Sequence, residues 1–211
     1  MDKQEKVLAI LEALKAAYPD PVCALYYQKD YELLFAVRLS AQCTDERVNL
    51  ITPALFARYP TLEDYAGADI AEMEDLVHSC GFYHHKARDI ILGAQALLER
   101  FDGKVPGTME ELLTIPGVGR KTANLLLGDL YRVPGSVVCD THVIRITNKL
   151  GLAQGKEPEK VEKQLRAILP PEESSDFCHR VVLHGRAICT ARKPQCAACP
   201  LAPYCDAFTG A

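Results

Sequence analysis

A lysine that directly follows a glycine-rich turn is the residue in this chain most suited to chemistry. The segment Leu112–Ala123 contains a Pro-Gly pair, a second glycine, Arg120 and Lys121. Glycines allow a tight turn and let backbone N–H groups approach a ligand closely. A helix beginning at Arg120 adds a partial positive charge, so the loop is suited to hold a phosphate. Lys121 places an amine beside that anion, which predicts chemistry on a nucleic acid.

Two other structures could contain such a glycine-rich segment. Gly and Pro also form ordinary helix–helix turns, so the loop could be purely structural. A nucleotide P-loop is excluded, because the chain has no glycine separated by four residues from a Gly-Lys-Ser or Gly-Lys-Thr sequence.

Four of the nine cysteines fall in one short C-terminal stretch with the spacing C-x6-C-x2-C-x5-C: Cys189, Cys196, Cys199 and Cys205. Four thiolates this close in sequence can reach one centre, and a sulfur-only ligand set selects zinc or an iron–sulfur cluster. The spacing alone leaves both open. The other five cysteines have no partner spacing and are expected to be buried small apolar residues: Cys23, Cys43, Cys80, Cys139 and Cys178.

The composition is that of an ordinary globular protein. The 211 residues are 48% hydrophobic and 25% charged, with a net charge of −4. The longest uncharged stretch, Pro194–Cys205, is broken by prolines, so no membrane span is expected. Residues 1–6 contain no apolar signal-peptide core, which predicts a cytoplasmic protein. Four cations and no acid lie in His179–Gln195, which permits one basic face on an acidic protein.

Helical periodicity dominates the remaining sequence and predicts an all-α protein of about ten helices. Apolar stripes mark helices over residues 7–14, 70–77, 90–101 and 161–169. Pro158 suits a first helical turn, and Ser175 is suited to cap the next helix. Pro53 is expected to kink or restart a helix over residues 45–59.

Several motifs together resemble the endonuclease III family. The hairpin Ile115–Ala123 resembles its helix-hairpin-helix, and the cysteine spacing resembles its [4Fe–4S] signature. Four shorter matches are Leu39–Gln42, Cys139–His142, Leu183–Arg186 and Ala191–Pro194. The matches run in family order from Leu33 to Cys205. Cys139 departs from the family, which more often has an aliphatic residue there; we expect this to alter packing only.

The resemblance implies a bifunctional DNA glycosylase and abasic-site lyase of base-excision repair, acting on oxidised pyrimidines in double-stranded DNA. It implies two α-helical lobes with a DNA cleft between them. Residues 25–133 would form a six-helix barrel that carries the hairpin. Residues 1–24 and 134–211 would form the second lobe, with one [4Fe–4S] cluster of structural role. A nucleoid-associated monomer is expected.

The resemblance assigns catalysis to two residues. Lys121 would attack C1′ of the damaged nucleotide and form a Schiff base, which leads to β-elimination. For this the amine must be neutral, a state that the helix N-terminus and partial burial favour; the alternative is an exposed phosphate-binding lysine. Asp140 would stabilise positive charge or move protons, and its alternative role is a plain helix N-cap.

The resemblance also places residues at the DNA. Gln42 matches the plug that fills the gap left by a flipped base. Phe82 stands at the apolar wedge, where the family usually has leucine; the alternative is a core aromatic after a helix end. The phosphate-binding residues are expected to be Gly117, Val118, Gly119, Arg120, Arg192 and Lys193. Residues suggested for the base pocket are Ser40, Asp45 and His142, although a structural hydrogen-bonding role suits His142 better.

Three other functions share parts of this pattern. An adenine glycosylase of the same superfamily would lack a lysine at position 121 and would carry a further C-terminal recognition domain. A thymine-mismatch glycosylase also disagrees with Lys121, though less firmly. A non-catalytic DNA-binding module would use the hairpin and the metal centre as a clamp, and it would not need both Lys121 and Asp140.

Overall fold

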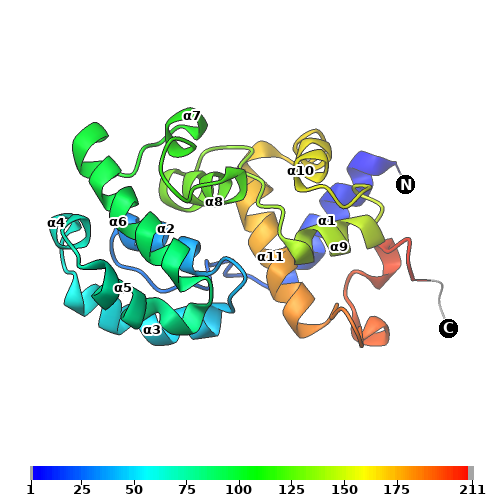
Figure 1. Ribbon diagram of the computed structural model, residues 1–211. Helices are drawn as coiled ribbons and strands as arrows, with labels where there is room; N and C mark the ends of the chain where they lie inside the picture. Colours follow the sequence, from blue (N-terminus) through cyan, green and yellow to red (C-terminus); the bar gives the residue numbers. More distant parts are fainter. Residues whose placement is uncertain (1, 209–211) are drawn as a thin grey trace. The chain divides into compact units, whose positions relative to one another are not determined.

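The structure, a computed structural model, describes residues 2–208 and divides into two compact helical units (Figure 1). The first, here called the hairpin unit, is Cys23–Tyr131. The second, the cysteine unit, combines Met1–Val22 with Arg132–Ala211. The described residues form eleven α-helices and four short 3-10 turns, without a strand. This confirms the prediction of an all-α protein.

The hairpin unit is built around a helix that is apolar on almost every side. Its elements are α2 (Asp30–Leu39), α3 (Asp45–Arg58), α4 (Leu62–Ala66), α5 (Ile70–Val77), a 3-10 turn (His78–Cys80), α6 (Tyr83–Arg100), α7 (Met109–Leu112) and α8 (Arg120–Tyr131). Helix α2 buries Leu33, Leu34, Phe35 and Leu39, as expected for a core helix. The long helix α6 packs against α2, α4 and α5, and α8 packs against α2 and α7.

The prediction that a helix restarts at Pro53 is wrong, and a kink there stays a prediction. Helix α3 continues through this proline from Asp45 to Arg58. Pro53 lies on the exposed side of the helix. Because water can reach that side, the carbonyl that loses its N–H partner can be solvated, so the proline is tolerated without ending the helix.

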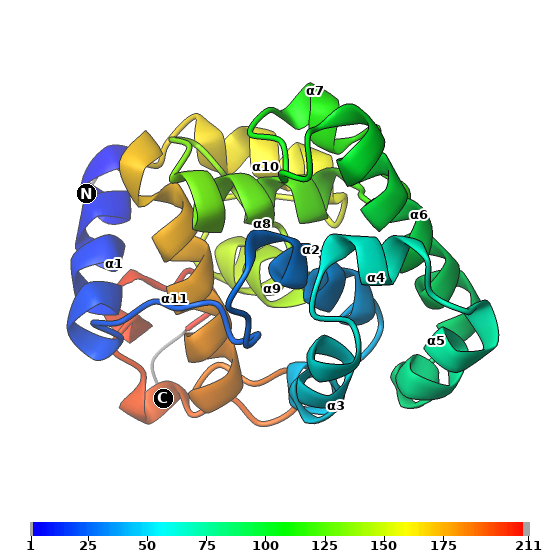
Figure 2. The ribbon, with the colours of Figure 1, turned by 90° about the vertical axis from the view of Figure 1, so that its left-hand side faces the viewer.

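The cysteine unit is centred on α11 (Ser174–Ala187). Its other elements are α1 (Lys3–Ala17), α9 (Thr141–Lys149), α10 (Pro158–Arg166) and 3-10 turns at Pro171–Glu173, Cys196–Ala198 and Ala202–Tyr204. Helix α11 contacts α1 and α9, and Figure 2 shows α1 and α11 beside each other. Gly185 allows α9 to approach closely, because a Cβ there would lie 2.6 Å from His142 Cδ2.

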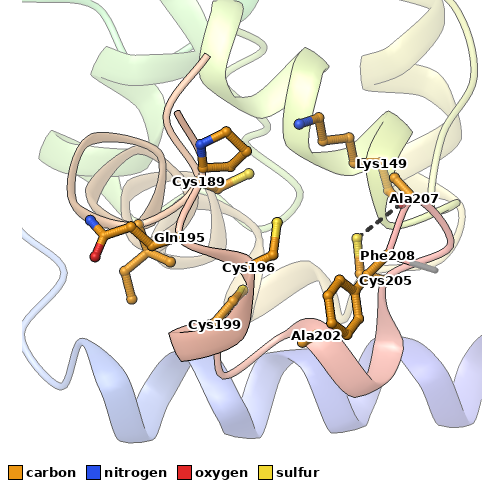
Figure 3. A pocket seen from close by; sticks show the side chains of 11 residues that line it. Lys149, Cys189, Gln195, Cys196, Cys199, Ala202, Cys205, Ala207 and Phe208 are labelled. Carbon is orange, nitrogen blue, oxygen red and sulfur yellow. Dashed lines mark hydrogen bonds between the residues drawn. The ribbon is translucent and has the colours of Figure 1, made fainter. Parts of the chain in front are cut away.

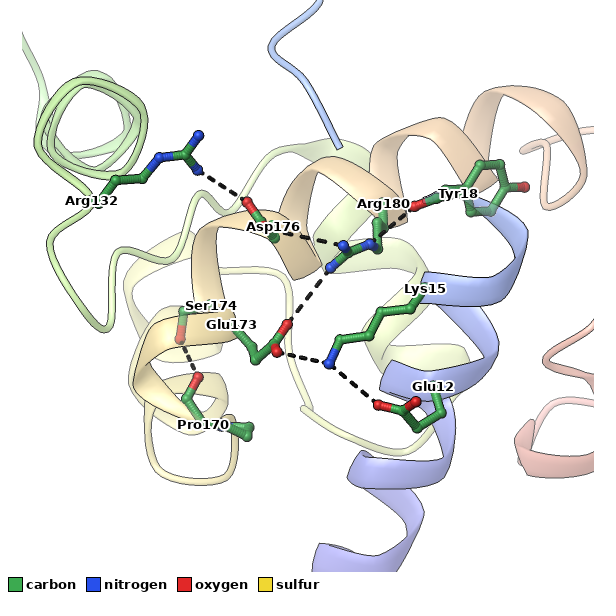
Figure 4. A network of polar contacts seen from close by, with 9 residues as sticks. All are labelled: Glu12, Lys15, Tyr18, Arg132, Pro170, Glu173, Ser174, Asp176 and Arg180. Atoms are coloured by element: carbon green, nitrogen blue, oxygen red, sulfur yellow. Dashed lines mark hydrogen bonds and ion pairs between the residues drawn. The ribbon is translucent and has the colours of Figure 1, made fainter. Parts of the chain in front are cut away.

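A polar network attaches the N-terminal helix to α11 (Figure 4). Lys15 Nζ lies 2.7 Å from the carboxylate of Glu173, and Arg180 Nε donates to the carbonyl of Tyr18 at 3.1 Å. Arg180 also faces Glu173, at 3.7 Å. Because the arginine is nearly buried, this cross-link joins two distant parts of the sequence more firmly than a surface pair would.

Two predicted helix starts have different outcomes. Pro158 is the first residue of α10, as predicted. The prediction that Ser175 caps the next helix is wrong, because α11 begins at Ser174 and continues directly from the 3-10 turn Pro171–Glu173. Helical backbone already precedes Ser175, so it does not have the extended conformation of a cap.

None of the helices in residues 2–208 combines the length and apolarity that a bilayer crossing requires.

Candidate nucleic-acid interface and cysteine centre

The glycine turn and its lysine lie where the sequence predicts them. Helix α7 ends at Leu112, Ile115 is buried below the turn, and α8 opens at Arg120. Gly117 has φ +78°, a left-handed conformation that favours glycine. Lys121 is exposed in the first turn of α8, so the expected partial burial of its amine is not observed.

The turn rests on an ion pair that sequence reasoning did not identify. Arg38 of α2 and Asp89 of α6 are joined by two contacts to Asp89 Oδ2, 2.7 Å from Arg38 Nε and 2.6 Å from Nη2. A Cβ on Gly117 would lie 2.7 Å from Arg38 Nε and 2.8 Å from Asp89 Oδ2. The backbone of Gly117 therefore packs directly on the ion pair, and only glycine fits there without displacing it.

Helix α6 supports the residues before the turn as well. Arg100 Nη2 donates to the carbonyl of Thr114 at 3.1 Å. A Cβ on Gly93 would lie 3.7 Å from Ile115 Cγ2, so this part of α6 is also in contact range of the turn. The contacts of Asp89, Gly93 and Arg100 follow each other along one helix, which fixes the position of the turn within the hairpin unit.

Gln42 and Phe82 come together on one open pocket. The lining residues are Arg38, Ala41, Gln42, Phe82, His85 and Lys86. Both Gln42 (φ 54°) and Phe82 (φ 49°) have left-handed backbone although neither is glycine. Such strain concentrates at functional sites. Phe82 is 63% exposed, which excludes the alternative of a core aromatic.

Ser40 and Asp45 lie on either side of Gln42 in the sequence but do not line this pocket. The Ser40 hydroxyl donates to the carbonyl of Val37 at 2.9 Å, at the end of α2. Asp45 opens α3 directly after its N-cap, Thr44. Both residues thus have local roles in ending one helix and beginning the next.

Asp140 is the N-cap of α9. Its Oδ1 accepts from the backbone N–H of Val143 at 2.7 Å, and its Oδ2 lies 3.2 Å from Nδ1 of His142. The His142 ring is in turn held against Gly185 of α11. This geometry fits the structural role expected for His142, because the ring fixes the orientation of the Asp140 carboxylate.

The four C-terminal cysteines line a single pocket of the cysteine unit (Figure 3). Residues 2–208 contain no group of three or more Cys, His, Asp or Glu side chains arranged around a single metal ion. A [4Fe–4S] cluster offers each thiolate its own iron, so four thiols around one pocket fit it. The cluster, when bound, supplies a covalent cross-link among Cys189, Cys196, Cys199 and Cys205.

Cationic and hydrogen-bonding groups surround these thiols. Arg145 Nη1 donates to the carbonyl of Cys189 and lies 3.6 Å from its Sγ. His184 Nε2 lies 3.4 Å from Cys199 Sγ, and its Nδ1 lies 3.2 Å from the Tyr18 hydroxyl. Burial, with Arg145 nearby, lowers the pKa of His184, which favours the neutral ring. Positive charge and N–H donors near sulfur stabilise thiolate ligands.

The exposed cations Arg192 and Lys193 lie in the loop between Cys189 and Cys196. The backbone N–H of Lys193 donates to the Thr190 hydroxyl at 3.3 Å. Gln195 fixes the far end of this loop, because its N–H donates to the carbonyl of Ile188 and its side chain to that of Ala187.

Of the five remaining cysteines, Cys80, Cys139 and Cys178 are buried as predicted. The prediction is wrong for Cys23 and Cys43, which are only partly buried.

Sequence reasoning also missed the buried Lys86. A signal for it exists, since Lys86 falls on the same helical face as the buried apolar residues Ile90 and Ala94.

Comparison with known proteins agrees with this architecture. Residues 35–171 match the family model of the HhH-GPD superfamily of base excision DNA repair proteins, and residues 189–205 match the iron-sulfur binding domain of endonuclease III. Endonuclease III of Synechocystis sp. is 46% identical over 203 residues, which cover 96% of this chain and 93% of that protein. Endonuclease III of Escherichia coli K12 is 38% identical, covering 95% of each.

A solved structure of a trapped endonuclease III–DNA covalent intermediate, described as an estranged-adenine complex, matches with a TM-score of 0.92. It is 39% identical in sequence, and the match covers 99% of this chain and 98% of that one. These matches span nearly the whole sequence, include the glycine turn and end on the four cysteines. The chain therefore belongs to the endonuclease III family of base-excision DNA repair glycosylases and abasic-site lyases, which hold a [4Fe–4S] cluster.

Proposed function

We propose that this protein removes oxidised pyrimidines from duplex DNA and then cleaves the strand 3′ to the abasic site, with Lys121 as the nucleophile. The observation that carries the assignment is the exposed amine of Lys121, one residue inside a helix whose glycine turn is fixed on α2 and α6. A fixed turn holds the phosphate backbone, and it brings the amine to the adjoining sugar. Because the substrate is chromosomal DNA, we place its action in the cytoplasm, at the nucleoid.

The reaction proceeds in two stages. Lys121 Nζ attacks C1′, the N-glycosidic bond breaks, and the base leaves with the bonding electron pair and a proton. Ring opening breaks the C1′–O4′ bond, O4′ takes up a proton from water, and an iminium ion forms between Nζ and C1′. Loss of a proton from C2′ then expels the 3′-phosphate by β-elimination, and water releases the lysine. Asp140, oriented by His142, would stabilise the positive charge that develops at C1′.

The proposed DNA contacts come from both units. The N–H groups of residues 117–120 and the cations Arg192 and Lys193 would bind phosphates. Gln42 and Phe82 would fill the gap left by the flipped nucleotide. The exposed Phe82 ring supports this role, since an apolar wedge is solvent-exposed before it enters the base stack.

Borohydride trapping on abasic-site duplex tests the lyase chemistry. Reduction of the iminium should join the parent protein covalently to DNA, and Lys121→Ala should bind DNA without being trapped. Asp140→Asn keeps a capping oxygen and should be trapped slowly while remaining folded. Absence of an adduct with cluster-loaded protein that binds the duplex would support the non-catalytic DNA-binding module instead.

A further inference from the structure

A buried lysine of the hairpin unit lies between the two segments that carry Gln42 and Phe82. Lys86, in the first turns of α6, is 1% exposed. Its Nζ donates to the carbonyl of Leu39 at 2.8 Å and to the carbonyl of Cys80 at 2.8 Å. Leu39 precedes Gln42 by three residues, and Cys80 precedes Phe82 by two. One ammonium group therefore binds the backbone just before both residues.

The two carbonyls explain why a charge without a carboxylate partner is stable here. Leu39 is the last residue of α2, and Cys80 is the last residue of the 3-10 turn His78–Cys80. Terminal carbonyls of helices lack intrahelical partners and carry partial negative charge, so a cation at this position is favoured. Burial still lowers the pKa of Lys86, because the ammonium group has lost its contact with water.

The left-handed backbone of Gln42 and Phe82 requires contacts that hold it, such as those from Lys86. Gln42 and Phe82 both have left-handed φ angles, which are maintained only when surrounding contacts hold them. Phe82 is the N-cap of α6 and makes no side-chain cap hydrogen bond, and its carbonyl accepts from the N–H of Lys86 itself at 3.1 Å. Lys86 thus bonds to the Phe82 segment at two points and to the Gln42 segment at one.

We propose that Lys86 is a positioning residue that holds the Gln42 and Phe82 segments at the separation needed to enter the base stack together. The inference rests on the proposed function, in which these two side chains replace the flipped nucleotide. Lys86 itself does not touch the reacting sugar. Its effect is confined to the part of the reaction in which a nucleotide leaves a stacked, paired duplex.

The test compares abasic sites in duplex DNA with abasic sites in single-stranded DNA, which need no unstacking or unpairing. Lys86→Met keeps the length of the side chain and removes its donors. Single-turnover borohydride trapping by Lys86→Met should fall about 10- to 100-fold on duplex, the range expected when reacting groups are misplaced by about 1 Å. Trapping on the single strand should change less than about twofold, because flipping is not required.

A second readout follows the flipping step directly. 2-Aminopurine placed opposite the abasic site should become more fluorescent when the parent protein binds, because the base is unstacked, and Lys86→Met should lose this rise. Lys86→Gln retains two N–H donors and should recover part of both signals. If Lys86→Met proves unstable, Lys86→Gln still tests the proposal. A lowered ratio of duplex to single-strand trapping supports it, and an unchanged ratio contradicts it.

Gln95 provides the matched control on the same helix. Its Nε2 donates to the carbonyl of Ala66 at 2.8 Å, away from both segments. Gln95→Leu should leave the ratio of duplex to single-strand trapping unchanged. The proposal is overturned if Lys86→Met leaves the ratio of duplex to single-strand trapping unchanged, whether trapping falls equally on both substrates or on neither. It is also overturned if Gln95→Leu changes this ratio as much as Lys86→Met does. If even the parent protein is trapped on neither substrate, the lyase function fails instead.

Discussion

Gly117 offers a sharp test of how the hairpin turn is held. Substituting alanine combines two effects. Left-handed backbone costs a non-glycine residue about 1–2 kcal/mol, of which about 0.4–1 kcal/mol is offset by lower entropy of the unfolded chain. The new Cβ would also lie 2.7 Å from Arg38 Nε and 2.8 Å from Asp89 Oδ2. Displacing that ion pair adds about 1–3 kcal/mol, typical of overpacking.

Two other glycines separate these effects. Gly135 has φ +75° but no atom within 4 Å of a built Cβ, so Gly135→Ala should show the backbone cost alone, about 1 kcal/mol. Gly119 has neither a positive φ nor a close neighbour, so Gly119→Ala should be neutral or slightly stabilising. Gly117→Ala should be the most destabilising of the three, by about 2–4 kcal/mol.

The measurements are denaturant unfolding of the three variants and fluorescence anisotropy with an abasic-site duplex. Gly117→Ala should weaken DNA binding about 10- to 100-fold, the loss of one charge-assisted hydrogen bond of about 1.5–3 kcal/mol. Combining it with Arg38→Ala should relieve the clash and reveal a coupling free energy of about 1–2 kcal/mol. If Gly117→Ala costs no more stability than Gly135→Ala, the turn does not depend on the ion pair and the reasoning is refuted.

Three further predictions concern other parts of the molecule. Arg192→Ala and Lys193→Ala should each reduce the slope of log K against log salt by about 0.9, and an unchanged slope in DNA-binding titrations would remove that cation from the phosphate contacts. Cys196→Ser should lose the visible absorption of the cluster in purified protein, whereas full retention of the spectrum would exclude this cysteine as a ligand. The hydrogen bond from Arg58 lowers the pKa of Glu72 below its ordinary value of 4.5, so Glu72 stabilises the fold above that pH and the stabilisation is lost as the pH falls through the lowered pKa. Glu72→Gln should therefore lower the free energy of unfolding at pH 7, and this difference should shrink as the pH falls through the lowered pKa; a pH-independent difference would contradict the assignment.

Local patterns sufficed for most helices. Apolar stripes predicted α1, α5, α6 and α10, since helix burial repeats with a fixed period. The errors at Pro53 and Ser175 arise because the surrounding structure overrides the preference of a single residue, proline's against a helix interior and serine's for a helix N-cap. An exposed helix face accommodates Pro53, and a preceding 3-10 turn moves the start of α11 before Ser175.

The candidate site was only partly predictable for a related reason. The glycine turn and Lys121 fall in one short segment and the four cysteines in another, so the spacing within each segment reveals them. Arg38 contacts Asp89 and Lys86 contacts Leu39 across long sequence separations, and no sequence period reports such contacts. The exposure of Phe82 could likewise not be predicted, because the same residue type after a helix end also suits a core.

The discontinuous cysteine unit imposes an order on folding during synthesis. Helix α1 leaves the ribosome first, but its partner α11 begins about 160 residues later, roughly 10–30 s at about 5–20 residues per second. The hairpin unit is continuous and can fold in that interval. The apolar face of α1, which includes Ile10 and Leu14, must wait uncovered. A nascent chain stalled before α11 therefore still exposes the apolar face of α1 after the hairpin unit has folded.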